Sequence, residues 1–264
     1  MSTAGLVASR KLAERYSDVV RSLTADEWEA PSRCAGWSVK DLVAHTGSNF
    51  KVMVDPPAED PGAPTPATAE EMQELLVAQR RDWTSTQVAD EFLSSVDGAM
   101  GVLEMMQQDG VASTPMTMTD LGTYQSHQLS DAFAFDMWCH MYVDLLAPEG
   151  PVTRPVAEPD NEVLSAAIGW MWDGLPQMCK PVSSVLDRSL GVRLSGPGGG
   201  EWTLRPGSEF LTVEAGIIDA DTVIASTATS FVMWGTTRTS WRDHVSVDGD
   251  SDFAGTVLDT INIV

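Results

Sequence analysis

The sequence predicts an α+β fold, in which a helical bundle is followed by a small domain built on an antiparallel sheet. Two observations carry this prediction. In the first half, apolar residues recur at helical spacing behind recognisable helix starts. After about residue 150, the pattern changes to short β-branched and alternating runs separated by glycine-rich turns. A chain of 264 residues is long enough for both parts, and we place the domains at residues 1–150 and 151–264.

Two helices are predicted before residue 55. The first covers residues 4–23, where apolar side chains recur at helical spacing. The second begins after Ser38, which forms a capping box with Asp41 three residues later, and it carries His45. The following stretch, residues 55–68, contains five prolines and cannot be a helix or a central strand. We expect a loop there, either a lid or a plain surface excursion.

Two further helices complete the predicted bundle. One opens at Thr68, with Glu71 as its capping partner, and runs to about residue 108 with breaks near Thr84 and Gly98. The last runs from about residue 122 to 146. Four helices joined by short or irregular links favour a bundle, whose core suits a metal held by side chains of facing helices.

A linker at residues 146–160 separates this bundle from the second domain. A helix is predicted at about 160–179, and two more at about 227–237 and 252–260. Strand-like runs lie between them, at 183–196, 201–206, 210–216 and 221–227. The glycine-rich GPGGGE stretch between two of these runs predicts a hairpin connection. It lacks the Lys-Ser/Thr of a phosphate-binding loop.

The charge balance restricts the partners. The chain has 16 Lys and Arg against 38 Asp and Glu, a formal net charge of −22. Such a surface repels nucleic-acid phosphates and anionic membranes, so we expect neither as a partner. The N-terminal residues lack the apolar core of a signal peptide, and no segment is apolar over a membrane-spanning length. With three cysteines and no CxxC spacing, we expect a cytoplasmic protein with reduced thiols.

Three residues form a candidate metal site. Asp136 and His140 stand four apart, so their side chains leave one face of the last bundle helix, among apolar neighbours. A carboxylate in an apolar stripe is costly to bury without a partner. A divalent metal, with His45 contributed by another helix, resolves that cost and leaves one coordination position open, as in catalytic zinc sites. The alternative is a solvated Asp/His pair and a plain core histidine.

Two segments resemble a known family. Residues 23–47, LTADEWEAPSRCAGWSVKDLVAHTG, resemble the start of the mycothiol-dependent maleylpyruvate isomerase family, within the DinB-like metal-binding four-helix bundles. Residues 134–140, AFDMWCH, resemble its second motif, an acidic residue followed four positions later by His. The tail from residue 231 resembles its sterol-carrier-like C-terminal domain. The resemblance implies zinc held by His45, Asp136 and His140.

The chain departs from the family pattern at two places. The family's acidic ligand is Glu, and Asp136 is one methylene shorter. The family also carries a Gly-Arg pair in the C-terminal domain, whose Arg is thought to hold the substrate's carboxylates. Here Thr236 follows Gly235, and Arg238 comes two residues later. We therefore expect Arg238 or Arg242 to supply any positive charge that faces the substrate between the domains.

The resemblance implies an enzyme that acts on a small electrophilic substrate with a low-molecular-weight thiol such as mycothiol. A metal-bound thiol is deprotonated at neutral pH. The thiolate can add to a double bond and be expelled after rotation, which isomerises the substrate, or it can displace a leaving group, which transfers sulfur. Loss of the family Arg favours transfer or addition to a less carboxylate-rich substrate.

Two other functions stay open at this stage. The open metal position can bind water instead of a thiol, which gives a hydrolase or lyase that works without added thiol. The protein can also be a non-catalytic small-molecule binder that retains the metal site. Tight ligand retention without turnover distinguishes that case.

Overall fold

The computed structural model describes residues 2–58 and 66–263, which form two compact units. The first unit contains Met1–Asp120 and Tyr124–Glu158, and the second contains Leu121–Thr123 and Pro159–Val264. The main division falls inside the predicted linker. A helical region followed by a sheet domain is therefore confirmed, whereas a boundary at residue 150 stays a prediction.

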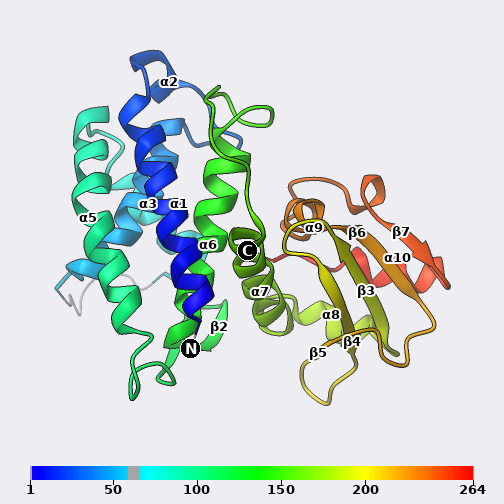
Figure 1. The fold of residues 1–264 in the computed structure, drawn as a ribbon. Helices are drawn as coiled ribbons and strands as arrows, with labels where there is room; N and C mark the ends of the chain where they lie inside the picture. The colour runs from blue at the N-terminus through cyan, green and yellow to red at the C-terminus, as the bar shows by residue number, and fades with distance from the viewer. Residues whose placement is uncertain (1, 59–65, 264) are drawn as a thin grey trace. The chain divides into compact units, whose positions relative to one another are not determined.

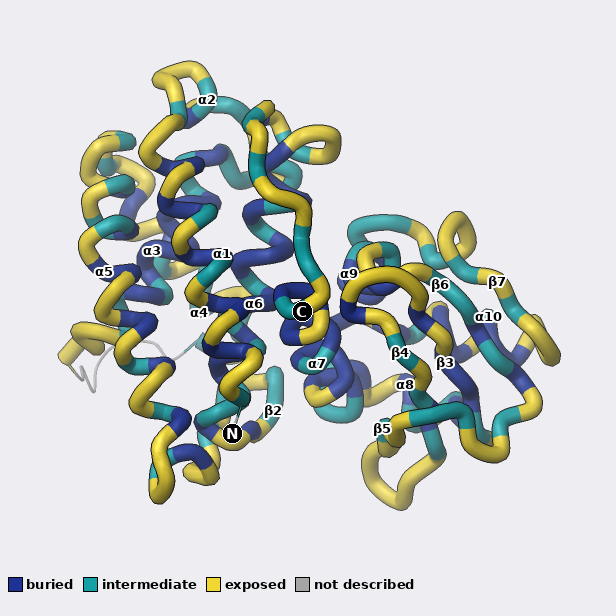
Figure 2. The backbone as a smooth tube through the Cα atoms, viewed as in Figure 1, coloured by how far each residue is buried: buried dark blue, intermediate teal, exposed yellow. Residues whose placement is uncertain are grey.

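Four long helices form the bundle of the first unit and run beside one another in Figure 1. Buried and exposed segments alternate turn by turn along them in Figure 2, as amphipathic helices require. The bundle helices are α1 (Thr3–Ser22), α3 (Val39–Val54), α5 (Ser85–Met105) and α6 (Leu129–Trp138), and two short helices join them, α2 (Ala25–Glu29) and α4 (Ala69–Ala78).

The predicted start of α3 is confirmed. The Asp41 amide donates to the Ser38 hydroxyl, and the Asp41 carboxylate accepts from the Ser38 amide. At α4, Thr68 caps the helix, but the Glu71 carboxylate accepts from the amide of Ala67, so the box is incomplete. The proline-rich stretch between these helices is irregular at residues 55–58 and 66–68, and its residues 59–65 lie outside the described residues.

The third predicted helix, from Thr68 to about residue 108, was expected to break near Thr84 and near Gly98. Only the first of these breaks is present. A new helix does begin after Thr84, which caps α5. The break near Gly98 is wrong, because α5 continues through it. A Cβ atom at Gly98 would lie only 2.8 Å from a Val54 methyl, so this glycine allows α3 to approach α5 closely.

The last bundle helix begins later than predicted. Residues 122–125 were expected to be helical, but they are strand β2 (Gly122–Gln125), which pairs with β1 (Pro115–Met118), and a 3₁₀ turn (Ser126–Gln128) follows. Gly122 has a φ of +120°, which a helix does not allow. At its other end, α6 widens into a π-helix, η2 (Cys139–Leu145). Such π-helical turns are rare in proteins, and those that occur often lie at functional sites.

The second unit contains a five-stranded sheet of order β5-β4-β3-β6-β7. Three pairings are antiparallel, as predicted, but β3 and β6 pair in parallel, so the sheet is mixed. Its elements are α7 (Asn161–Met178), α8 (Lys180–Val185), β3 (Leu190–Ser195), β4 (Gly200–Arg205), β5 (Thr212–Ala215), β6 (Val223–Thr227), α9 (Ala228–Gly235), η3 (Trp241–Asp243), β7 (Ser246–Asp248) and α10 (Ser251–Leu258).

The glycine-rich GPGGGE stretch connects β3 and β4, as predicted, with Gly196 and Gly198 at positive φ. The helices pack on the sheet and on each other: α9 contacts β3 and β6, and α7 contacts α9 and β5. Across the described residues, no helix combines the length and apolarity that crossing a membrane requires.

Candidate metal centre

Three side chains from two parts of the bundle meet at one point. His45 comes from the second turn of α3, Asp136 from α6, and His140 from η2. His45 Nε2 lies 3.2 Å from Asp136 Oδ1, and His140 Nε2 lies 3.4 Å from the same oxygen. The two imidazole rings are perpendicular, with their centroids 4.7 Å apart. One donor atom of each residue lies within 4.8 Å of the others.

The donor distances fit a metal. Two ligand atoms of a tetrahedral zinc ion with bonds of about 2.0–2.1 Å lie about 3.3 Å apart, which matches both distances to Asp136 Oδ1. The other carboxylate oxygen, Asp136 Oδ2, is buried and has no hydrogen-bond partner among the described residues. An unsatisfied buried carboxylate oxygen in a set of His and Asp donors is expected where a cation binds.

The charges of the three residues are strongly coupled. Burial alone would raise the pKa of Asp136, but the neighbouring His45 and His140 outweigh it and hold this pKa well below its usual range. Burial opposes charge on His140 too, yet Asp136, with help from Asp144, holds the pKa of His140 well above its usual value. In the metal-free protein, His140 is therefore an imidazolium, and its Nε2–H faces Asp136. A divalent cation at this point would displace that proton.

A further carboxylate orients His140. Asp144 Oδ2 lies 2.9 Å from His140 Nδ1 and accepts from the Cys34 thiol at 3.3 Å. A buried carboxylate only accepts, so Nδ1 carries the proton and Nε2 presents a lone pair once a metal is bound. The 2.9 Å distance is that of a hydrogen bond and is shorter than the ligand spacing of a zinc ion. Cys34, His140 and Asp144 could by composition form a second metal site. Their hydrogen bonds instead orient His140 toward the site that it forms with His45 and Asp136.

Sequence reasoning overlooked Asp144 and Cys34. Asp144 follows His140 at the same four-residue spacing that links Asp136 to His140, and this was the available signal. Cys34 lies in the turn that resembles the family, but no sequence spacing relates it to His140, because it reaches the site through tertiary contact. The backbone amide of Arg33 donates to the Asp144 carbonyl at 3.0 Å, which fixes the Cys34 turn against η2.

A family model described as the mycothiol maleylpyruvate isomerase N-terminal domain matches residues 9–145, more than half of the chain. The chain belongs to this family. The matched range contains every residue of the candidate centre. No curated protein sequence is significantly similar to the chain.

Two solved structures are similar over nearly the whole chain. One is the mycothiol-dependent maleylpyruvate isomerase, at 16% identity and a TM-score of 0.57, and the other is a histidine-to-alanine mutant of that enzyme, at 15% and 0.58. Each match covers 92% of this chain and 91% of the other. At this identity the likeness concerns the fold. A ubiquinone synthesis protein matches 40% of the chain with a TM-score of only 0.29, so the sterol-carrier-like character of the second domain stays a prediction.

The Gly-Trp-Ser segment of the family motif borders the centre. The Trp37 ring lies 5.3 Å from the His45 ring, and its Nε1 donates to Glu74 of α4 at 3.0 Å. The turn before α3 thereby covers one side of the site. The Asp136 side chain is nevertheless 27% exposed to solvent, so the centre is open at one edge.

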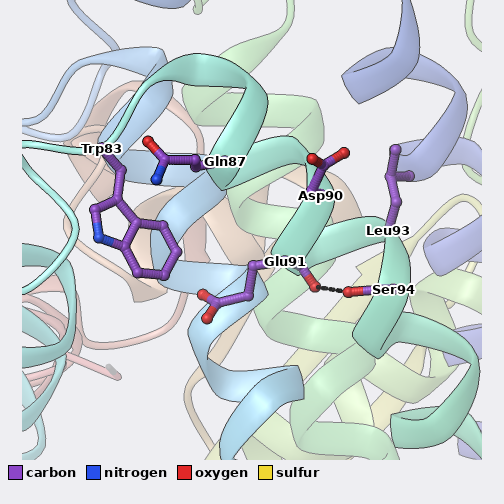
Figure 3. A pocket seen from close by; sticks show the side chains of 6 residues that line it. All are labelled: Trp83, Gln87, Asp90, Glu91, Leu93 and Ser94. Carbon is purple, nitrogen blue, oxygen red and sulfur yellow. Dashed lines mark hydrogen bonds between the residues drawn. The ribbon is translucent and has the colours of Figure 1, made fainter.

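A separate hollow of about 590 Å³ lies on the surface of the bundle, on and beside α5 (Figure 3). It is lined by Trp83, Gln87, Asp90, Glu91, Leu93 and Ser94. Its most buried carboxylate, Glu91, is bound by the Arg80 guanidinium, whose NH2 group lies 3.0 Å away. None of the metal-centre donors lines this hollow.

The arginines of the second unit lie in a different environment. Arg242 donates two bonds to the Asp259 carboxylate, at 2.7 and 2.8 Å. A helix over about residues 227–237 was predicted, but α9 ends at Gly235, so Thr236 and Arg238 come after the helix. Thr236 is buried and donates to the Val232 carbonyl. A substrate-facing charge from Arg238 or Arg242 stays a prediction.

Proposed function

We propose that the chain is a metal-dependent enzyme of the mycothiol maleylpyruvate isomerase family, with zinc bound by His45, Asp136 and His140. The observation that carries this proposal is the convergence of His45 Nε2, His140 Nε2 and Asp136 Oδ1 at ligand spacing, with a solvent-exposed edge. Two imidazoles and one carboxylate leave a position for a fourth ligand, the arrangement of catalytic zinc sites.

The chain's own residues prepare the site for that ligand. Asp144 holds the proton of His140 on Nδ1, so Nε2 is available as a donor. Asp136 contributes one negative charge, and two neutral imidazoles contribute none, so a divalent ion here keeps a net charge of +1. The metal would supply a lowered pKa to a bound thiol, which is then present as thiolate at neutral pH.

We propose a low-molecular-weight thiol such as mycothiol as cosubstrate, because the family and its solved relatives are named for it. Its thiolate would add to an activated double bond of a small electrophile and leave again after rotation, or displace a leaving group from it. Thr236 at the family's arginine position favours the second reaction, or addition to a substrate with fewer carboxylates.

The cell compartment follows from the same chemistry. The structure has no disulfide between the three cysteines, and Cys139 and Cys179 are buried. Reduced cysteines and a thiol cosubstrate both suit a reducing compartment, so we propose the cytoplasm.

The test is a metal and thiol titration of the purified protein. Elemental analysis should find close to one divalent metal ion per chain. After cobalt replacement, adding mycothiol or a close analogue near pH 7 should produce an intense near-ultraviolet thiolate-to-cobalt band, and the His45→Ala variant should not develop it. A protein that contains no metal, and takes none up on titration, would end this proposal.

The same experiment separates the other two functions. Turnover of an ester or amide substrate without thiol, and with no thiolate band, identifies a metal hydrolase. A thiolate band in a protein that never consumes an electrophile identifies a binding protein.

A further inference from the structure

Two hydroxyl groups are buried without a partner close to the metal centre. Tyr16 of α1 and Thr46 of α3 are both completely buried. Neither Tyr16 Oη nor Thr46 Oγ1 meets hydrogen-bond geometry with any described residue, although the two hydroxyls are close enough to interact with each other. Burying a hydroxyl without a partner destabilises a fold, so each such group requires an explanation.

Packing explains the tyrosine ring but not its hydroxyl. The ring stacks edge to face on Phe92, with the centroids 5.1 Å apart, in the core shared by α1 and α5. Phenylalanine would make the same contact without leaving a hydroxyl unsatisfied. The hydroxyl must therefore serve something that a hydrocarbon ring cannot.

The surroundings of the hydroxyl identify what it serves. Tyr16 neighbours Thr46, which follows the metal-centre residue His45, and it lies within electrostatic reach of His140, Asp136 and Asp144. Asp136 Oδ2 is also buried and unpartnered. This oxygen can only accept a hydrogen bond, and a phenol hydroxyl is a good donor.

We propose that Tyr16 is a positioning residue of the metal centre. In the metal-bound protein, its hydroxyl donates to Asp136 Oδ2, directly or through one buried water, and accepts from Thr46 Oγ1; in the described structure neither bond is formed. With Oδ2 engaged, Asp136 presents only Oδ1, the oxygen that both imidazoles already face. This inference rests on the metal centre of the proposed function and adds α1 to the helices that hold it.

The test compares metal affinity with metal-free stability. The variants are Tyr16→Phe and Thr46→Val, with Thr46→Ser as the conservative replacement, and Tyr124→Phe as a control that removes the hydroxyl of another buried tyrosine. Zinc affinity is measured by competition with a chromophoric chelator, and the stability of the metal-free protein by urea unfolding.

Tyr16→Phe should bind zinc about tenfold to a hundredfold more weakly than the parent, the usual loss when an outer-shell partner is removed. The metal-free variant should be at least as stable as the parent, because an unsatisfied hydroxyl has been removed. Thr46→Val should weaken zinc binding by a smaller factor, and Thr46→Ser should restore it. The Tyr124→Phe control should bind zinc like the parent.

Zinc affinity unchanged in Tyr16→Phe would overturn the inference while leaving the proposed function in place. A loss of metal-free stability in Tyr16→Phe would also overturn it, since the hydroxyl would then have a partner within the bundle. If Tyr16→Phe does not fold, equal zinc affinities for Thr46→Val and Thr46→Ser have the same meaning. A parent protein that binds no zinc refutes both proposals together.

Discussion

Both units carry ion pairs, but among the described residues only the bundle also gathers His, Asp and Cys donors at one place. In the bundle, Asp136 and two histidines converge in a largely buried place and leave Asp136 Oδ2 and His45 Nδ1 without partners in the described structure. In the sheet unit, four arginines each pair with a carboxylate at 2.6–2.9 Å on the surface: Arg188 with Asp250, Arg193 with Glu201, Arg205 with Glu214, and Arg242 with Asp259.

The difference indicates where ligands bind. Exposed ion pairs satisfy each other and contribute little. Converging buried donors with unsatisfied atoms cost free energy, and a bound ligand offsets that cost. The bundle therefore carries the candidate chemistry, and substitutions should have much larger effects there than in the sheet unit.

The largest effect is expected at a metal ligand. His140→Ala should abolish stoichiometric zinc binding and thiol-dependent turnover, because only His45 and Asp136 then remain as donors. It should also lower the free energy of unfolding by about 1–3 kcal/mol, since Asp136 loses a partner. Elemental analysis and urea unfolding measure the two effects. His244→Ala, at an exposed histidine, is the control and should keep its zinc. If His140→Ala retained its zinc, the bundle donors would not be the metal site, and the proposed difference between the two units would be wrong.

A smaller loss of zinc affinity is expected when Asp144 or Cys34, which lie behind His140, is replaced. Asp144→Asn keeps the shape of the side chain but removes the charge that orients His140, so zinc binding should weaken about tenfold or more. Cys34→Ser keeps a donor to Asp144 and should change the affinity less. Chelator competition measures both variants. If they bind zinc as tightly as the parent, the orientation of His140 does not depend on this set.

The metal-free protein should show a pH dependence that begins in the bundle. The pKa of Asp136 is lowered in the folded state, so its contribution to stability is present above the unfolded pKa of about 3.9 and is lost as the pH falls further. The pKa of His140 is raised, so its contribution is complete below about pH 6.5 and is lost as the pH rises through the folded pKa.

Urea unfolding of the metal-free protein should therefore give lower stability at about pH 9 than at about pH 6, and again below about pH 4. The alkaline loss should be absent in His140→Ala. It should also be absent in the zinc-loaded protein, where His140 is a neutral ligand. An alkaline loss of equal size in His140→Ala would assign this pH dependence to other groups.

Local signals in the sequence were sufficient for parts of this structure. Ser38 and Asp41 fix the start of α3 because capping is decided within four residues. Asp136 and His140 are related by helical spacing alone. The need for glycine at position 98 comes from Val54 of another helix, and the parallel pairing of β3 and β6 depends on residues about thirty positions apart. Neither has a local signal.

The residues of the candidate site also differ in whether the sequence signals them. The meeting of His45 with Asp136 was expected from the charge cost and the family motifs, whereas its role as a ligand stays a prediction. Tyr16 had the helical spacing of an ordinary core residue, so nothing in the sequence distinguished its hydroxyl. Only the absence of a described partner for that hydroxyl draws attention to it.

The smallest effects are expected at the arginines of the sheet unit. Arg242 is exposed, stacks on Trp241 and already donates two bonds to Asp259. A substrate carboxylate would have to compete with Asp259 for this guanidinium. Arg242→Ala should therefore leave the Michaelis constant for an anionic electrophile nearly unchanged, and Asp259→Asn, which frees the guanidinium, should lower it if Arg242 can reach the substrate at all.

Arg238→Ala is the sharper test of this region. If Arg238 replaces the family's arginine, its loss should raise the Michaelis constant about tenfold, the effect of one charged hydrogen bond of roughly 1.5 kcal/mol. Zinc affinity should stay unchanged, because the metal donors belong to the bundle. Steady-state kinetics with an anionic substrate and its methyl ester separate a charge effect from a general disturbance. Unchanged constants for Arg238→Ala and Arg242→Ala would remove anion binding from this segment and leave the bundle as the source of all specificity.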